Sequence, residues 1–213
     1  MAKLTGRKTD KRNFAKSRLH HIFGLAESDE RKTATIMSVV ILAVVWYVYS
    51  SISNFWVTAN LTMAVSGTVL IGLSFLLGPI FRWFLPGNDP SEYRKIFGML
   101  GFGLIAIHVL ISFSFRSAST FKEGNELSVI AASLSFIIFA LLASTSSSLV
   151  IEGIGYEKWV TIQRTGYIAL VLAMIHFYLV GKERFIGSLL GQIVYIIVSL
   201  AILTKIVQIV KKE

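Results

Sequence analysis

Long apolar stretches, separated by short polar connections, fill the chain from about residue 34 onward. A helix needs about 20 residues to cross the hydrocarbon core of a bilayer, and each stretch has about that length. Because lipid offers no water to backbone amide and carbonyl groups, each stretch is predicted to be a helix. The pattern therefore predicts an all-α integral membrane protein, a six-helix bundle. The expected spans are residues 35–55, 60–84, 93–115, 128–150, 157–180 and 188–210.

The segment 1–33 differs from the rest, because it is polar and rich in lysine and arginine. It lacks the apolar run and the small-residue cleavage site that mark a signal peptide. Two connections, 85–93 and 121–126, contain turn-forming glycine and asparagine. We divide the chain into a basic cytoplasmic tail, 1–33, and a transmembrane domain, 34–213.

Composition agrees with a membrane protein, since 54% of the residues are hydrophobic and only 15% are charged. A soluble domain carries about 25% charged residues. The net charge of +9 is spread unevenly. In the predicted topology, 17 lysines and arginines lie on the side of the membrane that holds both termini, and four lie on the other side. The positive-inside rule then predicts cytoplasmic termini, and we expect the inner (plasma) membrane of a bacterium. This asymmetry accounts for the charge without nucleic acid, and the tail is either a topology signal or a clamp for anionic lipid.

Ionisable groups inside a membrane are costly, so each is a candidate for function. The chain has no cysteine, which excludes thiolate metal sites and disulfides. His108 and His176 lie in the third and fifth spans, which run in the same direction, and both fall in the outer half of the membrane. Two imidazoles facing each other at one depth suit a six-coordinate haem iron. The alternative is that each histidine only bonds across helices to serine, threonine or backbone.

Helical spacing adds a second observation. Residues seven apart lie nearly on one face of a helix, so Arg94, Gly101 and His108 form one stripe. Gly101 leaves room either for the edge of a macrocycle or for close helix packing. No phosphate-binding loop, zinc-protease motif or dinucleotide fingerprint is found in the sequence.

Two stretches carry a resemblance to a known family. "RKIFGMLGFGLIAIH" (94–108) and "LLASTSSSLVIEGIGYEKWVTIQRTGYIALVLAMIHF" (141–177) resemble the histidine-bearing helices of ferric reductase-like transmembrane domains. Within that family the chain is most similar to the haem-binding membrane subunit of bacterial protein-methionine-sulfoxide reductase systems. Iron reductases and NADPH oxidases share the membrane core.

The resemblance implies roles for individual residues. His108 and His176 match the outer-haem ligand pair, and Arg94 matches an arginine that contacts a haem propionate or another anion. Gln163 falls where the family usually has a second histidine, and an amide is a poor iron ligand. We therefore expect one b-type haem in the outer half of the membrane, with Gln163 kept as a cofactor-binding candidate.

The predicted function is electron transfer by an oxidoreductase-type subunit embedded in the lipid bilayer. Electrons would pass from a quinol or flavin donor to an acceptor on the outer side, such as a partner reductase. We also interpret Arg82, Arg94, Lys95 and Arg164 as a cluster that holds an anionic donor, against the alternative of plain positive-inside bias. Two other functions stay open: a haem-free scaffold or small-solute transporter, and a direct reductase of metal ions or oxygen.

Overall fold

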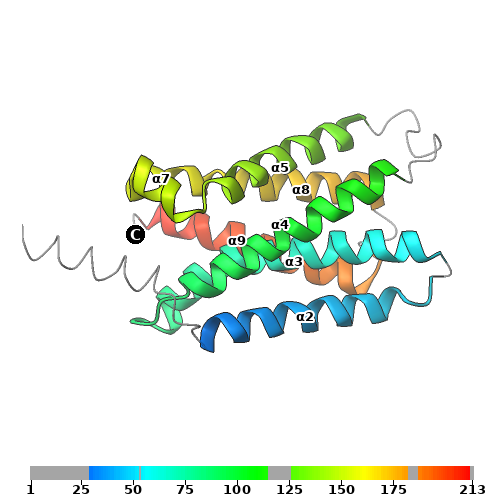
Figure 1. The fold of residues 1–213 in the computed structure, drawn as a ribbon, viewed down its shortest axis with the longest axis horizontal. Coiled ribbons are helices and arrows are strands. Elements are labelled where there is room, and N and C mark those ends of the chain that lie inside the picture. The colour runs from blue at the N-terminus through cyan, green and yellow to red at the C-terminus, as the bar shows by residue number, and fades with distance from the viewer. Residues whose placement is uncertain (1–28, 53, 115–125, 182–186, 212–213) are drawn as a thin grey trace, which may run out of the picture.

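The computed structural model describes residues 29–52, 54–114, 126–181 and 187–211. The predicted tail up to residue 28 lies outside the described residues, and so does the predicted connection 121–126 except for its last residue. Everything assigned a regular structure in the described part is α-helical (Figure 1). The helices are α2 (Asp29–Tyr49), α3 (Phe55–Phe84), α4 (Ser91–Ser114), α5 (Glu126–Ser144), α6 (Ser148–Ile154), α7 (Tyr156–Arg164), α8 (Gly166–Gly181) and α9 (Leu189–Val210).

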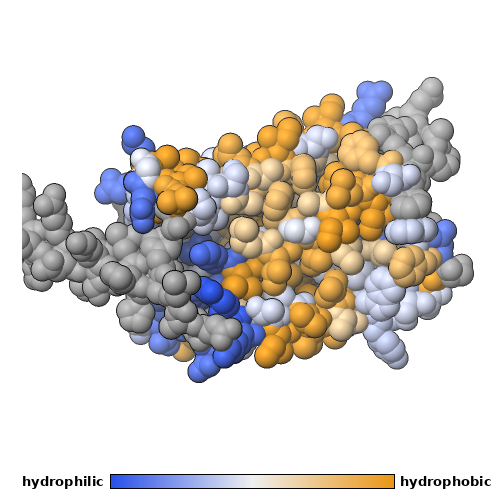
Figure 2. Space-filling view, viewed as in Figure 1, coloured by the Kyte–Doolittle hydropathy of each residue, from blue (hydrophilic) through white to orange (hydrophobic). Residues whose placement is uncertain are grey.

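Six candidate membrane spans confirm the predicted fold class, with α7 and α8 together forming the fifth. Large apolar side chains are exposed along the outer faces of the helices, as expected where lipid is the solvent (Figure 2). The chain is an integral, multi-pass membrane protein. The first helix in the described ranges, α2, begins at Asp29, which lies inside the segment 1–33 that was predicted to be the tail.

The fourth and fifth predicted spans needed correction, because serine and threonine side chains interrupt the helices there. α5 ends at Ser144 rather than at residue 150. The hydroxyls of Thr145 and Ser146 donate to the carbonyls of Leu141 and Leu142, at 2.9 and 2.7 Å. Such bonds satisfy the last carbonyls of a helix in place of the next backbone turn.

A similar interruption divides the fifth span into α7 and α8. The Thr165 hydroxyl donates to the carbonyl of Ile162 at 2.8 Å, and Gly166 follows. A side chain at Gly166 would collide with the ring of Phe75, so the glycine lets the start of α8 lie directly against this ring of α3. Hydropathy alone predicted one continuous helix because it does not register hydroxyl–backbone competition.

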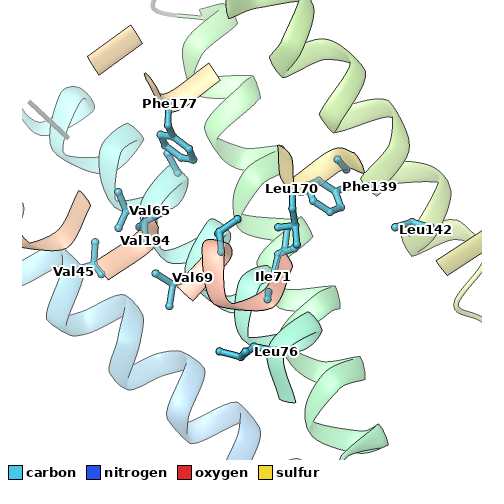
Figure 3. Close-up of a cluster of buried hydrophobic side chains, with 14 residues drawn as sticks. Val45, Val65, Val69, Ile71, Leu76, Phe139, Leu142, Leu170, Phe177 and Val194 are labelled. Carbon is cyan, nitrogen blue, oxygen red and sulfur yellow. The ribbon is translucent and has the colours of Figure 1, made fainter. Parts of the chain in front are cut away.

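α3 is the most buried span and packs against α2, α4 and α9, whereas α5 packs against α8. The contact between α3 and α4 is closest at two glycines, Gly67 of α3 and Gly101 of α4. A Cβ built on either glycine would lie 2.9 Å from the carbonyl oxygen of the other. The core beside this contact gathers apolar side chains from α2, α3, α5, α8 and α9 (Figure 3). Small residues thus let two backbones approach, as is common in membrane bundles.

All lysines and arginines in the described ranges lie toward one end of the bundle. We call it the basic end: α2, α4 and α7 begin there, and α3, α5 and α9 end there (Figure 1). The other end of the bundle is called the opposite end. That the basic end faces the cytoplasm remains a prediction from the charge count.

We predict that Gly101→Ala destabilises the protein by about 1–3 kcal/mol, because the added methyl meets backbone that cannot move aside. Gly103→Ala is the matched control: it lies on the same helix, and nothing stands within 4 Å of its Cβ position. Thermal unfolding in detergent measures both variants. Equal midpoints for the two would show that the α3–α4 contact is looser than described.

Candidate functional site

His108 lies on the face of α4 that packs against α3. Its Nδ1 is 3.2 Å from the carbonyl oxygen of Asn60. Because a carbonyl oxygen only accepts, Nδ1 carries the proton and donates. The ring is thereby held in the tautomer that leaves the Nε2 lone pair available.

A pair of side-chain hydrogen bonds fixes the acceptor for His108. The Asn60 amide donates to the Ser112 hydroxyl at 3.1 Å, and that hydroxyl donates back to the Asn60 amide oxygen at 3.2 Å. Ser112 stands one turn beyond His108 on α4. This clamp joins α3 to α4 beside the imidazole and keeps the Asn60 carbonyl opposite it.

His176, on α8, is held in a similar way by α5, the helix that packs against α8. Its Nδ1 lies 3.1 Å from the carbonyl oxygen of Ser128 and 2.9 Å from the Ser128 hydroxyl. Ser128 belongs to the first turn of α5 and is only 1% exposed. The carbonyl again requires a proton on Nδ1, and the hydroxyl oxygen accepts a share of it.

The two imidazoles lie at similar heights in the bundle. The rings of Phe102 on α4 and Phe136 on α5 stack with centroids 5.7 Å apart, which gives a common level. His108 is six residues from that level, or about 9 Å, and Ser128 is eight residues, or about 12 Å, both toward the opposite end. His176 shares the level of Ser128, and a charge on it would act on His108.

These features suit a haem iron between two histidines. Each Nδ1 donates to a main-chain carbonyl, the usual arrangement for a metal-ligating histidine. Among the residues that the structure describes, neither Nε2 has a hydrogen-bond partner, so both remain available to a ligand. Groups of three or more His, Cys, Asp or Glu side chains that could bind a metal ion are absent from the described ranges, so a metal there would rest on the two imidazoles.

Arg94 lies far from the histidine pair. It stands 14 residues before His108 on α4, about 21 Å along the axis, at the basic end. Its Nε donates to the carbonyl of Ser74 at 3.0 Å, and the Ser74 hydroxyl donates to the carbonyl of Arg94 at 2.7 Å. The predicted stripe of Arg94, Gly101 and His108 therefore faces α3 along its whole length.

Gly101 and Gln163 take part in helix packing in this structure. The space beside Gly101 is filled by Gly67 and Ile71 of α3. The Gln163 amide donates to the carbonyl of Leu142 at 3.2 Å and to the hydroxyl of Ser146 at 3.4 Å. Gln163 thus ties α7 to the end of α5 and lies at the basic end, away from the histidine pair.

Comparison with protein families decides the membership of this chain. Residues 63–174 match the family described as ferric reductase like transmembrane component, which is just over half of the sequence. The chain belongs to this family. The matched segment includes His108 and ends two residues before His176. No curated protein matches the chain.

Family membership gives this membrane protein a redox or electron-transfer role. The finer likeness to the methionine-sulfoxide reductase membrane subunit remains a prediction from the sequence. The residues that hold the two histidines in place were not predicted from the sequence. They are Asn60, Ser112 and Ser128. Their signal was that each is a polar side chain in or beside an apolar span.

We predict that Gln163→Leu costs about 1 kcal/mol of stability and leaves the visible absorbance spectrum of the protein unchanged. The Leu142 carbonyl loses one donor but keeps the Ser146 hydroxyl, so the loss is small. Thermal unfolding and a pigment assay measure the two quantities, with Thr161→Val as an exposed control on the same helix. Loss of haem at full stability would instead make Gln163 a cofactor contact.

Proposed function

We propose that this ferric reductase-like domain binds one b-type haem through Nε2 of His108 and of His176, and relays electrons across the membrane. The observation that carries the proposal is the pair of imidazoles at one level, each with Nδ1 donating to a main-chain carbonyl. That arrangement directs the remaining nitrogen of each ring to a ligand. Haem iron, when bound, supplies one-electron redox chemistry.

The residues around the imidazoles support such a role. An imidazole whose Nδ1–H is shared with an oxygen is a more basic ligand at Nε2, which favours the ferric state of a bound iron. Asn60 and Ser112 hold one ring through the α3–α4 clamp, and Ser128 holds the other through α5. The ring orientations are therefore fixed by the scaffold before any cofactor arrives.

A haem-free scaffold is the alternative, in which the histidines only join helices. The bonds at Nδ1 serve that role equally well. It gives no role to the two Nε2 atoms, however, and a polar atom within a membrane span is costly without a partner. The haem proposal accounts for both nitrogens of each ring.

The placement of the positive charges supports a direction for electron transfer and a side of the membrane for each redox partner. We propose that a quinol or flavin donates electrons from the basic end, and that the basic end faces the cytoplasm of a bacterium. The histidine pair lies nearer to the opposite end, where an outer reductase would accept electrons. The family resemblance to a methionine-sulfoxide reductase subunit supports an acceptor of that kind.

His108→Ala and His176→Ala are each expected to lose most of the bound haem, and to leave any haem that remains five-coordinate, because only one imidazole then ligates the iron. The reduced-minus-oxidised absorbance spectrum, divided by protein concentration, measures the loss. His20→Ala, in the predicted tail, is the control and keeps its haem.

Gel filtration and circular dichroism establish that the variants are folded. Full haem retention in either variant would remove that histidine from the ligand pair. A colourless wild type, expressed with abundant haem, would favour the scaffold.

Ser128→Ala is expected to raise the midpoint potential of the haem. The variant keeps the main-chain acceptor at 3.1 Å but loses the hydroxyl at 2.9 Å, so Nε2 becomes less basic and the ferric state less favoured. A redox titration followed by absorbance measures the shift.

Ser135→Ala is the matched control for this measurement. Ser135 lies on the same face of α5, is also buried, and donates to the carbonyl of Ala169 at 2.9 Å rather than to a histidine. It loses a similar bond to α8 without touching the ligand. Equal potentials in the two variants would contradict the role given to the Ser128 hydroxyl.

A further inference from the structure

Four positive side chains from four different helices lie together at the basic end. They are Arg82 of α3, Arg94 of α4, Arg164 of α7 and Lys205 of α9, and we call them the cationic cluster. The three arginines all act electrostatically on Lys205. α7 and α9 are not adjacent in the sequence to any other element of the four, so the fold itself assembles the charge.

The geometry of the cluster centres on two aromatic rings. Lys205 Nζ lies 5.8 Å from the centroid of the Tyr167 ring, and that ring meets Phe75 edge to face at 4.9 Å. The Arg94 guanidinium lies against Gly78, one turn along α3 from Phe75, because a Cβ on Gly78 would be 3.3 Å from it. Arg82 and Arg164 stand about one turn from Gly78 and Tyr167 respectively.

The cluster has no negative partner within the described part of the chain. The ion pair found there joins Arg31 to Glu92, at 3.4 Å, and involves none of the four. Arg82, Arg94 and Arg164 are exposed, whereas Lys205 is half-buried, so repulsion from the three arginines acts mainly on Lys205, where water is partly excluded. An anion from outside the chain would offset that repulsion.

Positive-inside bias does not account for all of this arrangement. That bias concerns lysine and arginine in the connections between spans. Lys205 is different, because it lies within the apolar helix α9, five residues before Val210, and is half-buried. Lys95 is exposed like its neighbour Arg94, but it is not among the charges that act on Lys205.

We propose that the cationic cluster binds a phosphate group, with the Arg94 and Arg164 guanidinium groups and the Lys205 ammonium as its donors. Guanidinium forks match phosphate oxygens in pairs, and an ammonium adds a compact charge. Arg94 is already oriented for this by its bond to the Ser74 carbonyl. The phosphate belongs either to an anionic lipid headgroup or to a soluble phosphorylated molecule, and haem binding is not required.

Two binding measurements on the purified full chain in neutral detergent test the proposal. Native mass spectrometry counts phosphatidylglycerol retained against phosphatidylcholine, and thermal unfolding measures stabilisation by inorganic phosphate. The variants are Lys205→Gln and Arg164→Gln, with Lys95→Gln as the control that removes equal charge outside the cluster. Lys205→Arg is the conservative variant, and every protein carries the same tail.

We expect Lys205→Gln and Arg164→Gln each to weaken binding of at least one probe by about tenfold or more, since each loses a charge-assisted bond. Lys95→Gln keeps wild-type binding, and Lys205→Arg restores most of it. An effect on phosphatidylglycerol alone identifies a lipid headgroup as the ligand, and an effect on phosphate identifies a soluble one. Equal losses in Lys95→Gln and Lys205→Gln, or unchanged binding in both cluster variants, would overturn the proposal.

Discussion

The contact between Gly67 of α3 and Gly101 of α4 sets the register on which the rest of the bundle depends. Each glycine faces the backbone of the other helix, so a slide along the axis would press a side chain against a carbonyl. Two polar contacts agree with this register, Asn60 with His108 and Ser74 with Arg94. In both helices they stand seven residues, or about two turns, from the glycine.

In the second helix pair, α5 and α8, two serines fix the register of the helices in a similar way. Ser135 bonds to the carbonyl of Ala169, and Ser128, two turns away, meets His176. Stacking of Phe102 on Phe136 then relates this pair to α4. The heights of the two histidines are thus set by packing of apolar faces and by hydroxyl–backbone bonds. No attraction between the imidazoles is needed to bring them level.

The sequence alone predicted the six spans well, because lipid imposes length and hydrophobicity on every crossing segment. It did not predict the breaks after Ser144 and at Thr165, where hydroxyls compete with the next backbone turn. Spacing placed Arg94 and His108 on one stripe but left open which helix that stripe faces. The acceptors for the histidines are main-chain carbonyls, which residue types do not reveal. Lys205 was counted with the positive charges on the side of the termini but not placed in the predicted cluster, because its closeness to the arginines depends on how the helices pack.

Polar groups inside this bundle are accommodated in two different ways. Around His108 and His176 they are neutral, and each bond at Nδ1 closes on a carbonyl within the chain. At the basic end they are charged, and the described part of the chain supplies no carboxylate to Lys205 or to its neighbouring arginines. A neutral group can be satisfied by backbone even deep in lipid, whereas a cation also needs a counter-charge or water. The bonds at Nδ1 are therefore closed within the protein itself, whereas the charges at the basic end depend on what surrounds them.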